Sequence, residues 1–74
     1  MKLAFIGTGK IIADALFAIE PIKEIEKTAI FARPHSKEKA EAFAKQYNIA
    51  EVYTDYEKLL TETTADTVYI GLIN

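Results

Sequence analysis

The chain has 74 residues, of which 50% are hydrophobic, and its 9 Lys and Arg against 11 Asp and Glu give a formal net charge of −2. This length allows at most one small domain, and the weakly acidic balance gives no reason to expect a nucleic-acid partner. With no cysteine and one histidine, disulfides and thiolate ligands are excluded, and we expect no metal site. No apolar run approaches the ~20 residues of a membrane-spanning helix, so we expect a cytoplasmic protein that does not engage a membrane.

The N-terminal residues predict a strand that turns into a helix. Residues 2–6 form a nearly continuous apolar run, the pattern of a strand covered on both faces, as in a parallel sheet. Glycines 7 and 9 follow, and the next apolar residues fall at i, i+3, i+4 and i+7 of a helix that Glu20-Pro21 ends. The residues of this helical stripe are Ile12, Ala15, Leu16 and Ile19.

The next segment predicts a second strand and a second helix. Residues 25–32 are apolar and β-tolerant in their later half, and Arg33-Pro34 ends this stretch. The stretch is predicted to be the second strand, and it completes a βαβ unit. Ser36 is interpreted as the cap of a helix over residues 37–47, and Asn48 as its left-handed C-cap.

The last third predicts another strand, helix and strand. Residues 49–53 fit a short strand, Thr54 and Glu57 have the spacing of a capping box for a short helix, and residues 67–73 fit another covered strand. The fold class is therefore α/β, a partial Rossmann-type doubly wound parallel sheet in the order β-α-β-α-β-α-β. Because that fold has two such halves, we expect residues 1–74 to be the truncated N-terminal portion of an NAD(P)-binding domain, with the substrate domain absent from this chain.

The turn after the first strand is the main candidate binding site. Gly7 and Gly9 match the first two glycines of the dinucleotide fingerprint G-x-G-x-x-G/A, and a strand, a helix and a second strand surround them as the fingerprint requires. Ile12 stands at the third position, where a branched side chain should hold the helix further from the sheet. Backbone N–H groups at such a helix start bind phosphate. The cofactor-binding candidates here are Gly7, Thr8, Gly9, Lys10, Ile11 and Ile12, and the alternative is a tight turn without a ligand.

Arg33 is the candidate for choosing between the two nicotinamide cofactors. An NAD-preferring fold usually presents Asp or Glu to the ribose at the end of the second strand, whereas this strand ends in Ala32-Arg33. A guanidinium group can pair with the 2′-phosphate of NADP. The alternative is a solvated arginine in an Arg-Pro turn. His35 and Ser36 could extend the pocket, although an exposed loop residue and a helix cap are the simpler interpretations.

With these residues identified, the whole chain resembles the N-terminal part of the Gfo/Idh/MocA oxidoreductase family. The likeness is carried by the glycine turn, by the strand end and Lys-Ala-Glu-rich helix that follow, and by the last strand with its terminal asparagine. In sequence these stretches are Ile6-Gly7-Thr8-Gly9-Lys10-Ile11, Phe31-Ala32-Arg33 with Lys39-Ala40-Glu41-Ala42-Phe43-Ala44, and Asp66-Thr67-Val68-Tyr69-Ile70-Gly71-Leu72-Ile73-Asn74.

The resemblance implies a hydride-transferring enzyme that uses NADP or NAD and acts on sugars, polyols and related alcohols or, in one branch, aryl diols. It places Leu72, Ile73 and Asn74 beside the nicotinamide, and it places the catalytic lysine and the substrate domain after Asn74, so no catalytic residue is expected in this chain. We expect a homo-oligomer for the full-length protein. Two alternatives stay open: a non-catalytic Rossmann nucleotide sensor or scaffold, and an S-adenosylmethionine-dependent methyltransferase, against which Arg33 argues.

Overall fold

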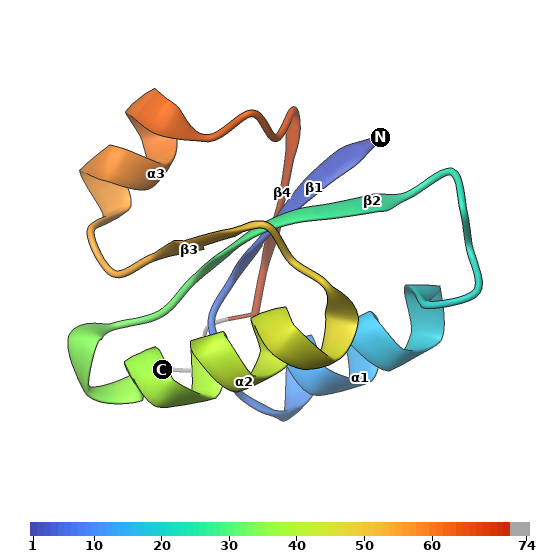
Figure 1. Ribbon diagram of the computed structural model, residues 1–74, viewed down its shortest axis with the longest axis horizontal. Coiled ribbons are helices and arrows are strands. Elements are labelled where there is room, and N and C mark those ends of the chain that lie inside the picture. Colours follow the sequence, from blue (N-terminus) through green and yellow to red (C-terminus); the bar gives the residue numbers. More distant parts are fainter. Residues whose placement is uncertain (72–74) are drawn as a thin grey trace.

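The computed structural model describes residues 1–71 and confirms the predicted α/β class and the order of the elements. Strands and helices alternate from the N-terminus onward, and one short 3₁₀ helix, η1, precedes the second α-helix (Figure 1). The elements are β1 (Lys2–Ile6), α1 (Lys10–Ile19), β2 (Glu26–Phe31), η1 (Pro34–Ser36), α2 (Lys37–Tyr47), β3 (Glu51–Tyr53), α3 (Tyr56–Glu62) and β4 (Thr67–Ile70).

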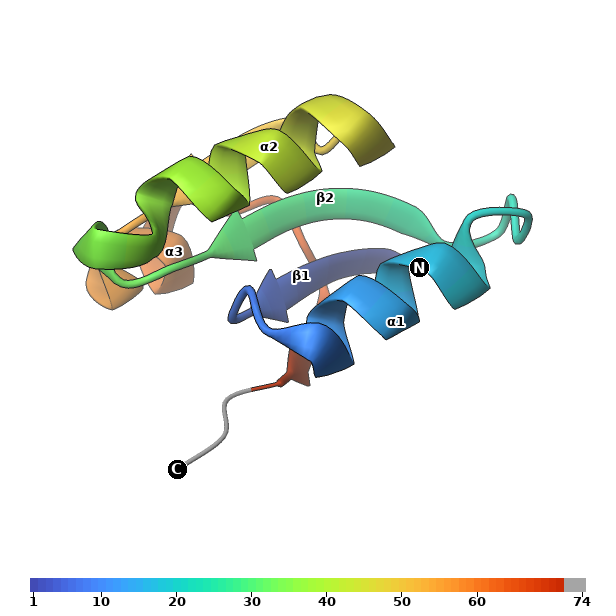
Figure 2. The ribbon, with the colours of Figure 1, turned by 90° about the horizontal axis from the view of Figure 1, so that it is seen from below.

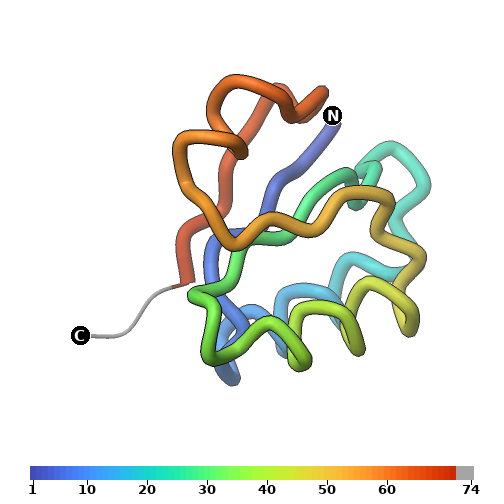
Figure 3. Tube along the Cα trace, turned by 60° about the vertical axis from the view of Figure 1, so that its left-hand side comes forward, coloured from blue at the N-terminus to red at the C-terminus, as the bar shows by residue number. Residues whose placement is uncertain are grey.

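The strands form a four-stranded sheet in the order β3-β2-β1-β4, and every pair is parallel. β1 is central, with Phe5 opposite Ile30 of β2 on one side and opposite Tyr69 of β4 on the other. In a parallel sheet all strands end at the same edge, where ligands of open α/β sheets bind. The ends of β1, β2 and β4 can be followed to that edge in Figure 3.

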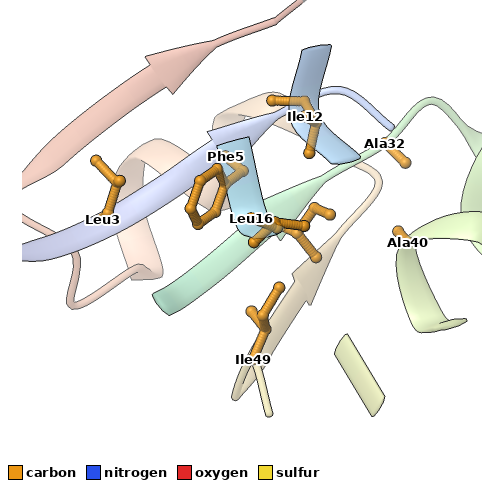
Figure 4. Packing of buried hydrophobic residues seen from close by; sticks show 8 residues of the cluster. Leu3, Phe5, Ile12, Leu16, Ala32, Ala40 and Ile49 are labelled. Atoms are coloured by element: carbon orange, nitrogen blue, oxygen red, sulfur yellow. The ribbon is translucent and has the colours of Figure 1, made fainter. Parts of the chain in front are cut away.

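Helices cover both faces of the sheet. α1 and α2 lie on one face and α3 on the other (Figures 1 and 2). Alternate residues of β1 divide between the two layers: Leu3 and Phe5 join the cluster beneath α1 and α2, while Ala4 and Ile6 pack with Leu59 of α3. This confirms that β1 is a strand covered on both faces. The larger cluster, drawn in Figure 4, consists of Leu3, Phe5, Ile12, Leu16, Ile30, Ala32, Ala40 and Ile49.

The prediction of a covered last strand is wrong for the residues that the structure describes. Val68, Tyr69 and Ile70 expose 46%, 40% and 66% of their surface. β4 lies at the edge of the sheet and pairs only with β1 within residues 1–71, and the helices described there pack chiefly over the other strands. Apolar sequence alone cannot tell a covered strand from an exposed apolar edge.

Helix caps were predicted with mixed success. Asn48 ends α2 in the left-handed conformation, with φ 59° and ψ 48°, as predicted. The capping box at Thr54 is wrong, because α3 is capped by the next residue, Asp55. The Asp55 carboxylate accepts hydrogen bonds from the backbone N–H of Glu57 at 3.0 Å and of Lys58 at 3.4 Å. A carboxylate also suits the positive end of the helix dipole, which a threonine does not exploit.

Within residues 1–71, no helix is long and apolar enough to cross a membrane. The same part of the chain brings together no group of three or more His, Cys, Asp or Glu residues that could hold a metal ion. Neither finding assigns a function.

One carboxylate ties β3 to the segment that leads into β4. The Glu51 carboxylate accepts hydrogen bonds from the hydroxyls of Thr63 at 2.7 Å, Thr64 at 2.8 Å and Tyr53 at 3.0 Å. Burial raises the pKa of Glu51, but these hydrogen bonds together outweigh burial and hold the pKa below its ordinary value of 4.5. The folded state therefore favours the charged form of Glu51. The charged carboxylate in turn stabilises the folded state, and this contribution is fully present above the pKa that Glu51 has in the unfolded chain.

We expect the free energy of unfolding to fall as the pH drops below about 4.5 through the folded pKa of Glu51. Urea unfolding of Glu51→Gln should show a weaker acid dependence than wild type in this range and a lower stability near neutral pH. Glu41→Gln, which removes an exposed carboxylate of α2, serves as the matched control. Identical acid profiles for Glu51→Gln and Glu41→Gln would contradict this role of Glu51.

Candidate functional site

A hollow of about 210 Å³ lies at the carboxyl edge of the sheet. It is bounded by the turn after β1, the segment after β2 and the residue after β4. The residues lining it are Gly7, Thr8, Gly9, Ala32, Arg33, His35, Ser36 and Gly71. The structure thus brings Arg33 to the glycine turn of Gly7, Thr8 and Gly9, and all four residues were predicted to bind the cofactor.

Gly7 forms the turn itself. Its φ of 120° lies in the region that favours glycine over residues with a side chain. Its backbone N–H donates to the carbonyl oxygen of Phe31 at 2.9 Å, which joins the turn to the end of β2. Gly7 therefore has a structural role, and its N–H is already paired.

Gly9 needs a different explanation. It is the N-cap of α1 with φ −80° and ψ −169°, an extended backbone that any residue can adopt. A Cβ atom built on Gly9 would meet no atom within 4 Å. Neither backbone geometry nor packing within the described residues requires glycine here. Gly9 is also one of the residues that line the hollow.

The start of α1 is open to an anionic ligand. No side chain of the described residues caps it, and its first turn carries no acidic residue. The first N–H groups of a helix have no partner within the helix, and the helix dipole favours negative charge beside them. The opening of α1 at Lys10 therefore offers N–H donors next to the hollow that have no acceptor within residues 1–71.

The segment after β2 supplies positive charge and a hydroxyl. Arg33 is exposed and extended, and Pro34 then begins η1, in which the N–H of Ser36 donates to the carbonyl oxygen of Arg33 at 2.8 Å. This turn brings His35 and Ser36 to the hollow. No acidic residue lines the hollow within residues 1–71.

Ser36 shows where the sequence interpretation fell short. It precedes α2, as predicted for a cap, but its side chain makes no capping hydrogen bond. The reason is that η1 runs directly into α2, and Ser36 has φ −112° and ψ 13° instead of the extended backbone of an N-cap. Pro34 was the available signal, because proline favours the first position of a helical turn.

Three other predicted residues lie around the hollow but do not line it. The Lys10 ammonium donates to the Asp14 carboxylate at 3.0 Å, and both side chains are largely exposed. Ile12 is completely buried, and the Ile11 side chain is partly exposed. Leu72, Ile73 and Asn74 lie outside the described residues, so their predicted place beside the nicotinamide stays a prediction.

The chemistry of the hollow suits a phosphate group. An uncapped helix start and a guanidinium, without a carboxylate among the lining residues, favour an anion. Pockets for drug-sized ligands measure roughly 300–1,000 Å³, so this hollow has room for part of a dinucleotide. A phosphate with its ribose is the fragment that matches its size and charge.

Comparison with known proteins agrees with this assignment. The chain is 29% identical over 73 residues to trans-1,2-dihydrobenzene-1,2-diol dehydrogenase of Xenopus tropicalis, and equally to that of Xenopus laevis. The match covers 99% of this chain and 22% of each relative. The chain therefore spans about a fifth of the length of these dehydrogenases.

Solved structures share the fold. The apo scyllo-inositol dehydrogenase of Lactobacillus casei superposes with a TM-score of 0.82 at 17% identity, over 99% of this chain and 21% of that one. The same enzyme with bound NAD(H) and scyllo-inositol gives a TM-score of 0.82 at 19% identity, with the same coverage. The family model described as an oxidoreductase family with an NAD-binding Rossmann fold matches residues 1–74. The chain belongs to this family, Gfo/Idh/MocA, and residues 1–74 lie in its nucleotide-binding Rossmann fold.

Proposed function

We propose that this chain binds the cofactor of an NAD(P)-dependent oxidoreductase, which transfers hydride to or from a sugar, polyol or related alcohol in the full-length protein. The observation that carries the proposal is Gly9, a glycine required by neither backbone geometry nor packing, beside an uncapped helix start. The dehydrogenase names of its relatives support the reaction type.

In this proposal the pyrophosphate lies against the residues of the glycine turn, from Gly7 to Ile12. Its oxygens accept from the backbone N–H groups at the start of α1, and the missing side chain of Gly9 permits close approach. Leu72, Ile73 and Asn74 border the nicotinamide, which supplies a hydride acceptor or donor when the cofactor is bound. Residues 1–74 bind and orient the cofactor, and groups elsewhere in the full-length protein hold the substrate.

The proposal includes a preference for NADP. Arg33 lies at the hollow, and no carboxylate of the described lining residues is placed to accept hydrogen bonds from the ribose hydroxyls. A planar guanidinium donates two parallel hydrogen bonds to phosphate oxygens, so Arg33 suits a 2′-phosphate. Ser36 and His35, beside Arg33, can donate further hydrogen bonds to the same group.

Titration of the full-length protein with NADPH and NADH tests the preference. We expect NADPH to bind more tightly, and Arg33→Glu to weaken NADPH binding about 10- to 100-fold, because it removes a charge-assisted hydrogen bond and adds repulsion. NADH binding should change little or improve. Lys45→Glu makes the same change of charge at an exposed residue of α2 outside the hollow and should alter neither affinity appreciably.

Two outcomes would contradict different parts of this proposal. Equal or tighter binding of NADH by the wild type, unchanged by Arg33→Glu, would exclude the NADP preference and leave the dinucleotide site. Binding of neither cofactor would exclude the nicotinamide assignment itself and favour a scaffold.

For the full-length protein we also propose a homo-oligomer, and for the isolated 74 residues no catalysis. Val68 and Ile70 on the edge strand form an exposed apolar surface, of the kind that further chain or a second subunit covers. The catalytic groups are proposed to lie outside these residues.

A further inference from the structure

The side chain of Ile12 fills the space that a side chain at position 71 would otherwise occupy. It stands at the third position of the glycine fingerprint, where a small residue normally lets the helix pack close to the sheet, yet its side chain is 0% exposed. This side chain fits because Gly71, the buried residue that follows β4, has no side chain. A Cβ atom on Gly71 would lie 2.6 Å from Cδ1 and 2.8 Å from Cγ1 of Ile12, far inside van der Waals contact.

The backbone does not explain the glycine at position 71. Gly7 is the glycine with positive φ among the described residues, and Gly71 is not in that region. The N–H of Gly71 donates to the carbonyl oxygen of Ile6 at 2.9 Å, which continues the pairing of β4 with β1. Any residue except proline can make such a bond, so the contact with Ile12 is the reason for glycine.

Ile12 has little freedom to move away from a side chain at position 71. It is β-branched, and such residues in a helix keep one strongly preferred χ1 rotamer. It also packs in the cluster that includes Phe5 and Leu16 (Figure 4), where close packing restricts the rotation that would move its Cδ1 atom away. A methyl group on Gly71 would therefore displace the first turn of α1.

We propose that Gly71 takes over the role of the missing third glycine and is a positioning residue for the cofactor site. Gly71 lines the hollow and at the same time receives the side chain of Ile12. It thereby sets how closely the start of α1 approaches the sheet. This distance determines the position of the backbone N–H groups that hold the pyrophosphate. The cofactor part of this inference rests on the proposed function.

The test compares Gly71→Ala, Ile12→Ala and the double variant in the full-length protein. Gly71→Ala should weaken binding of the preferred nicotinamide cofactor about tenfold or more and lower the unfolding temperature. In the double variant the alanine at position 71 fits the space left by Ile12, so affinity should recover to within about threefold of wild type. The unfolding temperature should likewise fall by less than the sum of the two single changes.

Leu16→Ala is the matched control, because Leu16 is a buried residue of the same helix outside the hollow. It should lower the unfolding temperature without changing the affinity of the folded protein, and it should not restore binding to Gly71→Ala. Wild-type affinity in Gly71→Ala, or rescue by Leu16→Ala as effective as by Ile12→Ala, would overturn the inference.

Failure of the proposed function would look different. If the wild type binds neither NADPH nor NADH, the cofactor assignment is wrong, and the packing relation is then decided by unfolding temperatures alone. Relief of the Gly71→Ala destabilisation by Ile12→Ala would still support Gly71 as the residue that positions α1, and simple additivity would overturn it.

Discussion

Replacing Gly9 with alanine is expected to weaken nicotinamide dinucleotide binding about 10- to 100-fold, as the loss of one charge-assisted hydrogen bond of roughly 1.5–3 kcal/mol implies. The new methyl group would stand at a residue that lines the hollow, with no atom from elsewhere in the described chain within 4 Å, and we expect it to keep the phosphate away from the start of α1. Folding should be unaffected, since the backbone of Gly9 is extended. Isothermal titration with NADPH and NADH measures the loss.

The control lies in the unfolding measurement and in a graded series. Gly9→Ala should unfold within about 1 kcal/mol of wild type, the cost of alanine at an N-cap, whereas Gly7→Ala should be destabilised more because its φ of 120° is strained for a residue with a side chain. A larger side chain, in Gly9→Val, should weaken binding further. Unchanged affinity in both Gly9 variants would mean that no ligand approaches the turn there.

The fold was largely predictable because the sequence pattern and the packing agree. The helical stripe at Ile12, Leu16 and Ile19 and the double-faced burial of β1 both follow from periodicity, and the structure confirms them. The exposure of Ile70 did not follow, because burial depends on which elements cover a strand. Local sequence records that a residue is apolar and does not record what packs over it.

The site was predictable where a short motif defines it and less so where distant elements meet. Gly7, Gly9 and Arg33 were predicted from the strand-turn-helix pattern and the strand end, and the structure places them around one hollow, while their role in binding stays a prediction. Ser36 was interpreted as a cap because the interpretation did not include the short helical turn that Pro34 begins and that runs directly into α2. The role of Gly71 was invisible, since its reason is the side chain of Ile12, which is adjacent only after folding.

Truncating the central aromatic residue should have the largest effect on stability. Phe5 is 0% exposed in the middle of β1, belongs to the larger core cluster, and its ring centroid lies 6.2 Å from that of Tyr69. Phe5→Ala is expected to lower the free energy of unfolding by about 3–5 kcal/mol, through lost burial and the cavity left behind. Domains are typically stable by only about 5–15 kcal/mol, so urea unfolding of the full-length protein should show a large shift in midpoint.

Phe17 provides a control of the same residue type, because its side chain is 76% exposed on α1. Phe17→Ala should cost no more than about 0.5 kcal/mol, and equal losses for the two phenylalanines would contradict the assignment of the core.

Phe5→Ala also reports on function. A ligand that binds only the folded state stabilises it by about 2.7 kcal/mol at 100 times its dissociation constant. If the chain binds the cofactor in its folded state, excess NADPH should therefore offset much of the stability that Phe5→Ala removes.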